Sequence, residues 1–136
     1  MKKLSLILLM ILLSSCTTMR YGNFTAPAEA RNVYLAQDAL LQLIRIYPPA
    51  QNTFCLNQKV TDGFGRSLIQ EMRKKGYGVI ENVHHKQKAN FFYVVDEIEL
   101  GQLYRVSLYI NSQALSRLYS SNKNQLAPVS AWSHKE

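Results

Sequence analysis

Residues 89–100, ANFFYVVDEIEL, form the longest run of strand-forming residues in this 136-residue chain. Aromatic and β-branched side chains favour strands because they pack well on a pleated, half-buried surface. Successive residues of a strand point to opposite faces, so Phe91 and Phe92 place apolar rings on both faces. The run therefore predicts a strand near the centre of a sheet.

The residues that follow predict a set of antiparallel strands. Residues 103–110, LYRVSLYI, alternate apolar and polar side chains, which is typical of a strand with one buried face. Gly101-Gln102 before them suits a turn or a bulge, and Asn111-Ser112 after them suits a hairpin turn. Residues 113–120 form a further strand with weaker alternation. Two shorter strands are expected at residues 53–58 and 77–83.

Helical spacing is found in the first half of the chain. Apolar residues recur at three- and four-residue intervals from residue 28 to Tyr47, and Pro48-Pro49 then stops the helix. A second helix begins after Asp62, whose carboxylate can accept hydrogen bonds from free amides of the first turn. It ends at Gly76, because glycine adopts the left-handed conformation common just after a helix.

The basic run Arg73-Lys74-Lys75 falls in the last turn of this second helix. Cations there interact favourably with the negative end of the helix dipole. We interpret the run as a helix-end feature, with a binding patch as the alternative.

The element order α-β-α-β-β-β predicts an α+β fold, a small two-layer domain with helices packed on a mainly antiparallel sheet. Four segments are expected along the chain. They are a signal peptide at 1–15, a tether at 16–27, the folded domain at 28–120 and a polar, loose tail at 121–136.

The first residues, MKKLSLILLMILLSSCTT, have the features of an export signal. Two lysines precede an apolar core that is too short to span a bilayer and that ends in small residues. The end, Leu13-Ser14-Ser15-Cys16, resembles the lipobox of bacterial lipoproteins. The resemblance implies acylation of Cys16 (diacylglycerol and palmitate-type chains), cleavage before it and anchoring in the outer membrane, facing the periplasm. A plain secretory signal with an incidental cysteine is the alternative.

Composition limits the remaining classes. Removal of residues 1–15 takes Lys2 and Lys3 away and lowers the net charge from +7 to +5. This surplus could favour anionic lipid headgroups or an acidic partner, but the basic residues are scattered, so no direct nucleic-acid binding is expected. Once Cys16 is acylated, Cys55 is the only thiol left, either as a small buried hydrophobe or in an intermolecular disulfide.

Few residues are suited to catalysis. His84-His85 could bind a metal, but a zinc site needs further ligands, for which only Asp96 or His134 could be suggested. Asp96, Glu97 and Glu99 form an acidic patch without a nucleophile or base motif, and pairing with Arg105 across a hairpin is the more ordinary role. Gly63-Phe64-Gly65 could hold an anion at a helix start, or serve packing. We expect no enzyme activity, no metal and no cofactor.

Several motifs in combination resemble the TrbH family of small conjugal-transfer lipoproteins. These are the lipobox, Phe64-Gly65-Arg66 with Leu68, Gly76-Tyr77-Gly78-Val79, Tyr93-Val94-Val95-Asp96, Gly101-Gln102 and Pro128-Val129-Ser130. The resemblance covers roughly residues 28 to 133. It implies a structural component of a conjugative type IV secretion system, without catalytic residues.

The resemblance also implies partners. The expected partners are other core proteins of the secretion channel, and a homo-oligomer or ring assembly is suggested by the family. Tyr109, Tyr119 and Trp132 are the candidate contacts, because tyrosine and tryptophan are common interface anchors. Tyr104 is a further candidate that the sheet core could equally bury. The alternatives are a binding module of another envelope machine, such as a secretin pilot or transporter auxiliary lipoprotein, and a small envelope hydrolase or metalloprotein.

Overall fold

The computed structural model describes residues 20–25, 28–81, 88–123 and 125–136. The helices are α2 (Glu29–Ile46), a short 3-10 turn (Pro49–Gln51) and α3 (Gly63–Lys74). The strands are β1 (Gly22–Asn23), β2 (Thr53–Leu56), β3 (Gly78–Glu81), β4 (Ala89–Glu99), β5 (Leu103–Ile110), β6 (Gln113–Asn122), β7 (Gln125–Pro128) and β8 (Ser133–Lys135).

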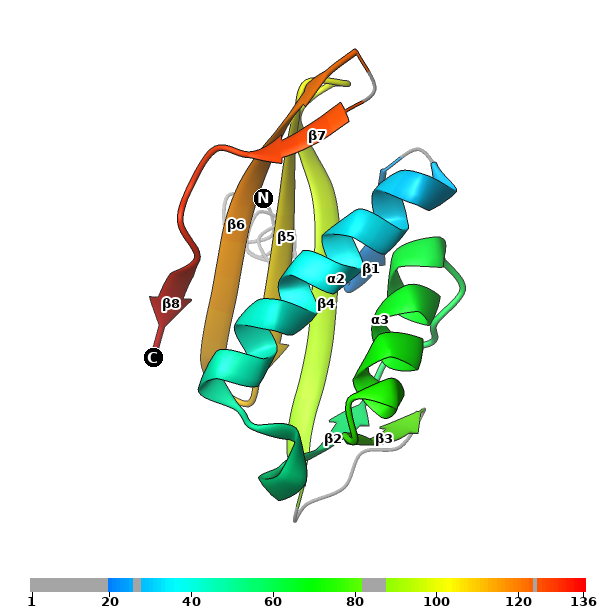
Figure 1. Cartoon of the computed structure of the whole chain (residues 1–136), viewed down its shortest axis with the longest axis vertical. Helices are drawn as coiled ribbons and strands as arrows, with labels where there is room; N and C mark the ends of the chain where they lie inside the picture. The colour runs from blue at the N-terminus through cyan, green and yellow to red at the C-terminus, as the bar shows by residue number, and fades with distance from the viewer. Residues whose placement is uncertain (1–19, 26–27, 82–87, 124) are drawn as a thin grey trace, which may run out of the picture.

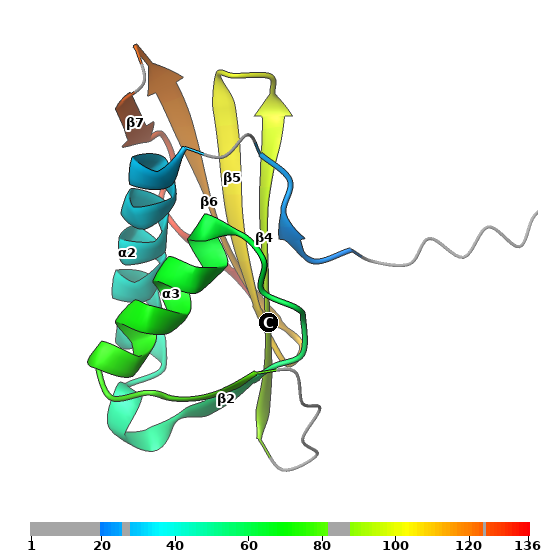
Figure 2. The ribbon, with the colours of Figure 1, turned by 90° about the vertical axis from the view of Figure 1, so that its right-hand side faces the viewer.

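One mixed sheet carries both helices. Its strand order is β3-β2-β4-β5-β6-β7, with β1 paired to β4 and β8 paired to β6. The ladders from β4 to β8 are antiparallel, whereas β2 runs parallel to both β3 and β4. Both helices lie on the same face of the sheet (Figures 1 and 2). The predicted α+β, two-layer architecture is confirmed.

Strand β4 holds the centre of this sheet, as its two apolar faces predict. β5 pairs along one edge, while β2 pairs with the first part of the other edge and β1 with a later part. The side chains of Phe91, Tyr93 and Val95 point to the helices and are at most 1% exposed. The register shifts between Glu97 and Glu99, so the strand is irregular where it leaves the core.

The local signals at both ends of α3 are confirmed. The carboxylate of Asp62 accepts a 2.8 Å hydrogen bond from the amide of Gly65, and Gly76 has φ +93° just after the helix. The basic end of α3 is paired: Arg73 bonds to Glu81 at 2.9 Å and Lys74 to Glu71 at 2.6 Å. Phe64, Leu68 and Met72 form the buried stripe of the helix.

A partly buried polar cluster joins α2 to the sheet. Asp38 accepts hydrogen bonds from the guanidinium of Arg117 at 2.9 and 3.1 Å and from the hydroxyl of Tyr119 at 2.6 Å. Charged groups strengthen hydrogen bonds of this kind. Burial first, and then the bond to Asp38, raise the pKa of Tyr119 well above its ordinary value.

The prediction of a loose tail after residue 120 was wrong. β6 continues to Asn122, β7 pairs with its second half, and β8 pairs with its first half through Ala114, Leu115 and Ser116. The indole of Trp132, which lies between β7 and β8 in the sequence, packs against the core. The sheet therefore includes most of the expected tail. Backbone hydrogen bonds to β6 hold β7 and β8 in place, although most of their side chains are exposed.

Buried tyrosines predict a loss of stability at alkaline pH. Burial raises the pKa of Tyr77 from 10.0 to about 12, and its hydroxyl donates a 2.5 Å hydrogen bond to the carbonyl of Tyr47. Because the folded pKa lies above the unfolded one, this stabilisation is complete below pH 10 and is lost as pH rises toward 12.

Urea unfolding at a series of alkaline pH values, with tyrosinate absorbance as a second readout, measures this effect. The free energy of unfolding is expected to fall above pH 10, and less steeply in Tyr77→Phe. Equal slopes in the two proteins would contradict the role given to Tyr77.

Candidate docking surface on the open face of the sheet

The face of the sheet opposite the helices carries an aromatic cluster. The ring of Tyr21 stacks on Phe92 with centroids 4.2 Å apart and meets Tyr109 edge-on at 5.8 Å. Phe92 and Tyr109 are cross-strand partners on β4 and β5. All three side chains are half-buried, so they combine packing with remaining accessible surface. Aromatic groups of this kind are the commonest anchors of protein interfaces.

Polar groups occupy the same face beside this cluster. Asp96 and Arg105 form a two-pronged ion pair at 2.6 and 3.1 Å, which confirms the pairing suggested by the sequence. The hydrogen bond to Asp96 raises the pKa of the Arg105 guanidinium. The hydroxyls of Ser107 and Ser116 lie 2.9 Å apart on the next pair of strands. Asp96 is thus committed to a structural pair rather than to proton transfer.

A hollow of about 240 Å³ lies along this face beside β6. Its walls are Arg105, Ser116 and Leu118 from the sheet together with Ser130, Ala131 and Ser133 from the segment between β7 and β8, with Arg117 completing the lining. The hollow exists only because the C-terminal residues return to pair with β6.

The N-terminal segment crosses from this open face to the helix side at Gly22. Tyr21 lies on the open face, whereas the side-chain amide of Asn23 (Nδ2) donates a 3.0 Å hydrogen bond to Oδ1 of the buried Asn32 of α2. Gly22 has φ +136°, a backbone conformation that side chains other than glycine rarely adopt. The amide of Phe24 then donates to the carbonyl of Val95 at 2.8 Å. Gly22 and Asn23, expected to be tether, form strand β1 of the sheet, and Tyr21 and Phe24 on either side of them contact it.

The structure places the candidate contact residues in different environments. Tyr109 lies half-buried on the open face, and Trp132 is half-buried on the other side of β6. Tyr119 is fully buried beneath α2, so its assignment as a partner contact was wrong. Tyr104 is 2% exposed, with the guanidinium of Arg31 over its ring. Helix α2 covers both buried tyrosines because they share the apolar face of β5 and β6.

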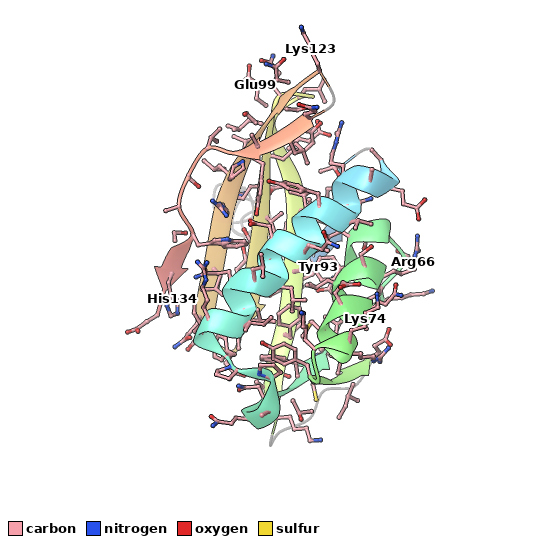
Figure 3. All side chains as sticks on the ribbon, viewed as in Figure 1. Arg66, Lys74, Tyr93, Glu99, Lys123 and His134 are labelled. Atoms are coloured by element: carbon pink, nitrogen blue, oxygen red, sulfur yellow. The ribbon has the colours of Figure 1, made fainter. Side chains whose placement is uncertain are left out.

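Within the part of the chain that the structure describes, the acidic and histidine residues considered for chemistry are not brought together. The Glu97 carboxylate accepts from the amide of Gly101 at 3.0 Å, and Glu99 lies at the far tip of the sheet (Figure 3). The His134 ring lies 3.1 Å from Gln113, near the C-terminal end of α2. His134 is on β8, which pairs with β6, so two strands separate it from Asp96 on β4. Cys16 and the pair His84-His85 lie outside the described residues. Among the described residues, no group of three metal-binding side chains occurs.

The start of α3 serves packing. The amide of Gly65 points at the Asp62 carboxylate, and the Asp62 carboxylate also accepts a 2.5 Å hydrogen bond from the Tyr93 hydroxyl. Burial first, and then this bond, raise the pKa of Tyr93. Asp62 therefore already supplies the negative charge that an anion would have brought.

Sequence reasoning missed Tyr21 and Phe92 as members of one surface. The only local signal was the pair of aromatic residues, Tyr21 and Phe24, in an otherwise polar tether. Their contacts depend on pairing with residues some seventy positions away, which periodicity cannot reveal.

Comparison with known proteins decides the family. Residues 18–136 match the family described as conjugal transfer protein TrbH. The chain belongs to the TrbH family. The match includes β1 and the C-terminal strands, so the expected tail and the expected tether from residue 18 onward are within the TrbH match. Neither curated proteins nor solved structures give a match. Neither α2 nor α3 is long and apolar enough to cross a membrane, in the part of this TrbH chain that the structure describes.

Proposed function

We propose that this protein is an outer-membrane-anchored periplasmic lipoprotein and a non-enzymatic structural component of a conjugative type IV secretion system. The observation that carries the proposal is the match of residues 18–136 to the family of conjugal transfer proteins. Membership makes the chain a conjugal transfer component; the anchor and the structural role are the proposed refinements.

The anchor is proposed from Leu13-Ser14-Ser15-Cys16. Acylation at the thiol and at the new amino terminus supplies two or more chains, which hold a protein stably, whereas one chain is marginal. Thr17, in place of an aspartate, favours the outer membrane. The lipid would then be attached five residues before Tyr21, where the chain meets the sheet.

The structural role is supported by the arrangement of polar groups. The described carboxylates of Asp38, Asp62 and Asp96 each bind a cation or a hydroxyl within the fold. The open face, with Tyr109 and Phe92, offers surface to another protein of the apparatus. Contact through Tyr109, and through the accessible part of Trp132, fits a subunit that works by binding.

Extraction of the tagged protein from membranes of donor cells tests the proposal. We expect label from radioactive palmitate on the protein, sedimentation with outer membranes, and co-purification after cross-linking with other transfer proteins of the same plasmid. Co-purification with a secretin or a lipid transporter instead would assign the protein to another envelope machine and contradict the proposed role. A protein without acyl label, found in the soluble periplasmic fraction, would contradict the anchor.

A further inference from the structure

A groove of about 550 Å³ runs along α3 on the side facing the edge of the sheet. Five of its lining residues are spaced three and four apart, so they form one stripe of the helix, and Val60 and Glu81 complete the lining. The stripe consists of Arg66, Ile69, Gln70, Arg73 and Lys74. Figure 3 shows Arg66 and Lys74 extending from α3, which itself lies at the β3 edge of the molecule in Figure 1.

Charge in the groove is predominantly positive. Three cations line it, Arg66, Arg73 and Lys74, against the one lining carboxylate of Glu81. Lys74 also bonds to Glu71 at 2.6 Å, through a side chain that is 58% exposed. The floor is apolar, since Ile69 is only 5% exposed and Val60 packs against the core. Among the described residues, the Arg66 guanidinium has one acceptor, the carbonyl of Thr61 at 2.8 Å, and so keeps donors for an incoming anion.

The groove adjoins a strand edge. β3 has β2 as its one neighbour in the sheet formed by the described residues, so its other edge presents backbone groups that can pair with a further strand. Arg73 partly covers this edge by donating to the carbonyl of Val79 at 3.1 Å and to Glu81 at 2.9 Å. The Arg73 side chain is 50% exposed, so these bonds can be exchanged for bonds to a ligand.

We propose that the groove binds an extended acidic segment of another envelope protein, which adds as a strand to β3. Backbone pairing along β3 supplies part of the affinity, as in other cases of strand addition. Carboxylates of the segment pair with Arg66, take the place of Glu71 at Lys74 and draw Arg73 away from Val79. Apolar side chains of the segment pack on Ile69 and Val60. The inference rests on the proposed function for the location of the partner.

The position of the groove favours a protein over anionic lipid headgroups. The chain reaches the sheet on the open face, where Tyr21 stacks on Phe92, and α3 lies on the opposite face. A lipid at Cys16 would therefore place the membrane nearer to the open face than to the groove. The combination of a strand edge with an apolar floor also suits a peptide, because headgroups use neither.

Binding of a probe peptide to the mature protein in non-ionic detergent tests this inference. The probe is an extended peptide in which glutamate alternates with valine, and its counterpart carries lysine at each glutamate. We expect the acidic probe to bind at least about tenfold more tightly than the basic one, because charged hydrogen bonds dominate the contact. It should also slow amide exchange at residues 78–81.

The matched variants are Arg66→Glu with Arg73→Glu in the groove, and Lys123→Glu with Lys135→Glu at exposed positions elsewhere. The groove variant should bind the acidic probe at least about tenfold more weakly, and the control variant should bind like the wild type. Circular dichroism confirms that both are folded. Equal binding by both variants, no binding of the acidic probe, or unchanged exchange in β3 would each overturn the inference.

Phosphatidylglycerol vesicles provide the competing arm. Vesicle binding that needs the groove cations, without slowing exchange at residues 78–81, would assign the groove to lipid headgroups and overturn the proposal. Because the assay requires neither acylation nor plasmid transfer as a readout, its failure leaves the lipoprotein role standing.

Discussion

Donor cells carrying Cys16→Ser are expected to transfer their plasmid about 100-fold less often, toward the level of donors that lack the protein. A serine hydroxyl cannot form the thioether, so the proposed acyl chains are not attached. Anchoring a protein at the surface where its partner lies can raise the apparent affinity for that partner by about 10² to 10⁴ without any new contact. Without the acyl chains this gain in apparent affinity is lost. Mating frequency, palmitate labelling and membrane fractionation measure the three steps separately.

The other cysteine provides the control. Cys55 is buried within β2 and is not part of the lipobox, so Cys55→Ala should keep both the acyl label and transfer. Immunoblots establish that the variant proteins accumulate equally. Wild-type transfer by an unlabelled Cys16→Ser protein would show that the anchor is dispensable, and continued labelling would place the acyl chains on another residue.

Gly65→Ala is expected to destabilise the domain by about 3 to 5 kcal/mol, a large part of the stability of a small domain. A Cβ atom at this position would lie 2.0 Å from the Tyr93 hydroxyl, 2.6 Å from its ring carbon Cζ and 2.8 Å from a methyl of Val60. The ring cannot move away, since Tyr93 is fully buried and contacts Phe64 at a centroid distance of 5.2 Å. The hydrogen bond from Tyr93 to Asp62 would break as well.

Chemical denaturation monitored by circular dichroism measures the loss. Gln70→Ala, an exposed substitution on the same helix, should change the free energy of unfolding by less than about 0.5 kcal/mol. Adding Tyr93→Phe to Gly65→Ala removes the closest atom and should recover part of the loss. Additive effects of the two substitutions would show that the glycine and the ring do not share space.

Local rules predicted the elements whose signals lie close together in the chain. Asp62 as a cap, Gly76 after the helix and the turn at Asn111 each depend on backbone geometry within a few residues. The central position of β4 was also predictable, because a run of apolar residues on both faces is typical of a strand in the interior of a sheet. These features follow from short-range physical chemistry.

The misassigned surface residues depend on distant contacts. β6 showed weak alternation because its helix-facing side includes Arg117, a charged residue that Asp38 neutralises from α2. The charge concealed the buried face, so Tyr119 was interpreted as exposed. The strands β7 and β8 are short and largely exposed, and only their pairing with β6 makes them strands. No pattern within residues 121–136 carries that information.

The docking of Tyr21 and β1 onto the sheet limits the reach of the domain from the bilayer. A tether of the predicted length, from residue 16 to 27, would let the domain sample a wide shell of the periplasm. With Tyr21 fixed on Phe92, only the five residues from position 16 to 20 separate the proposed lipid from the fold. At about 3.5 Å per extended residue, they span at most about 18 Å. If the proposed anchor is present, the domain would be confined to a thin layer beneath the membrane, and its partners would have to come to it there.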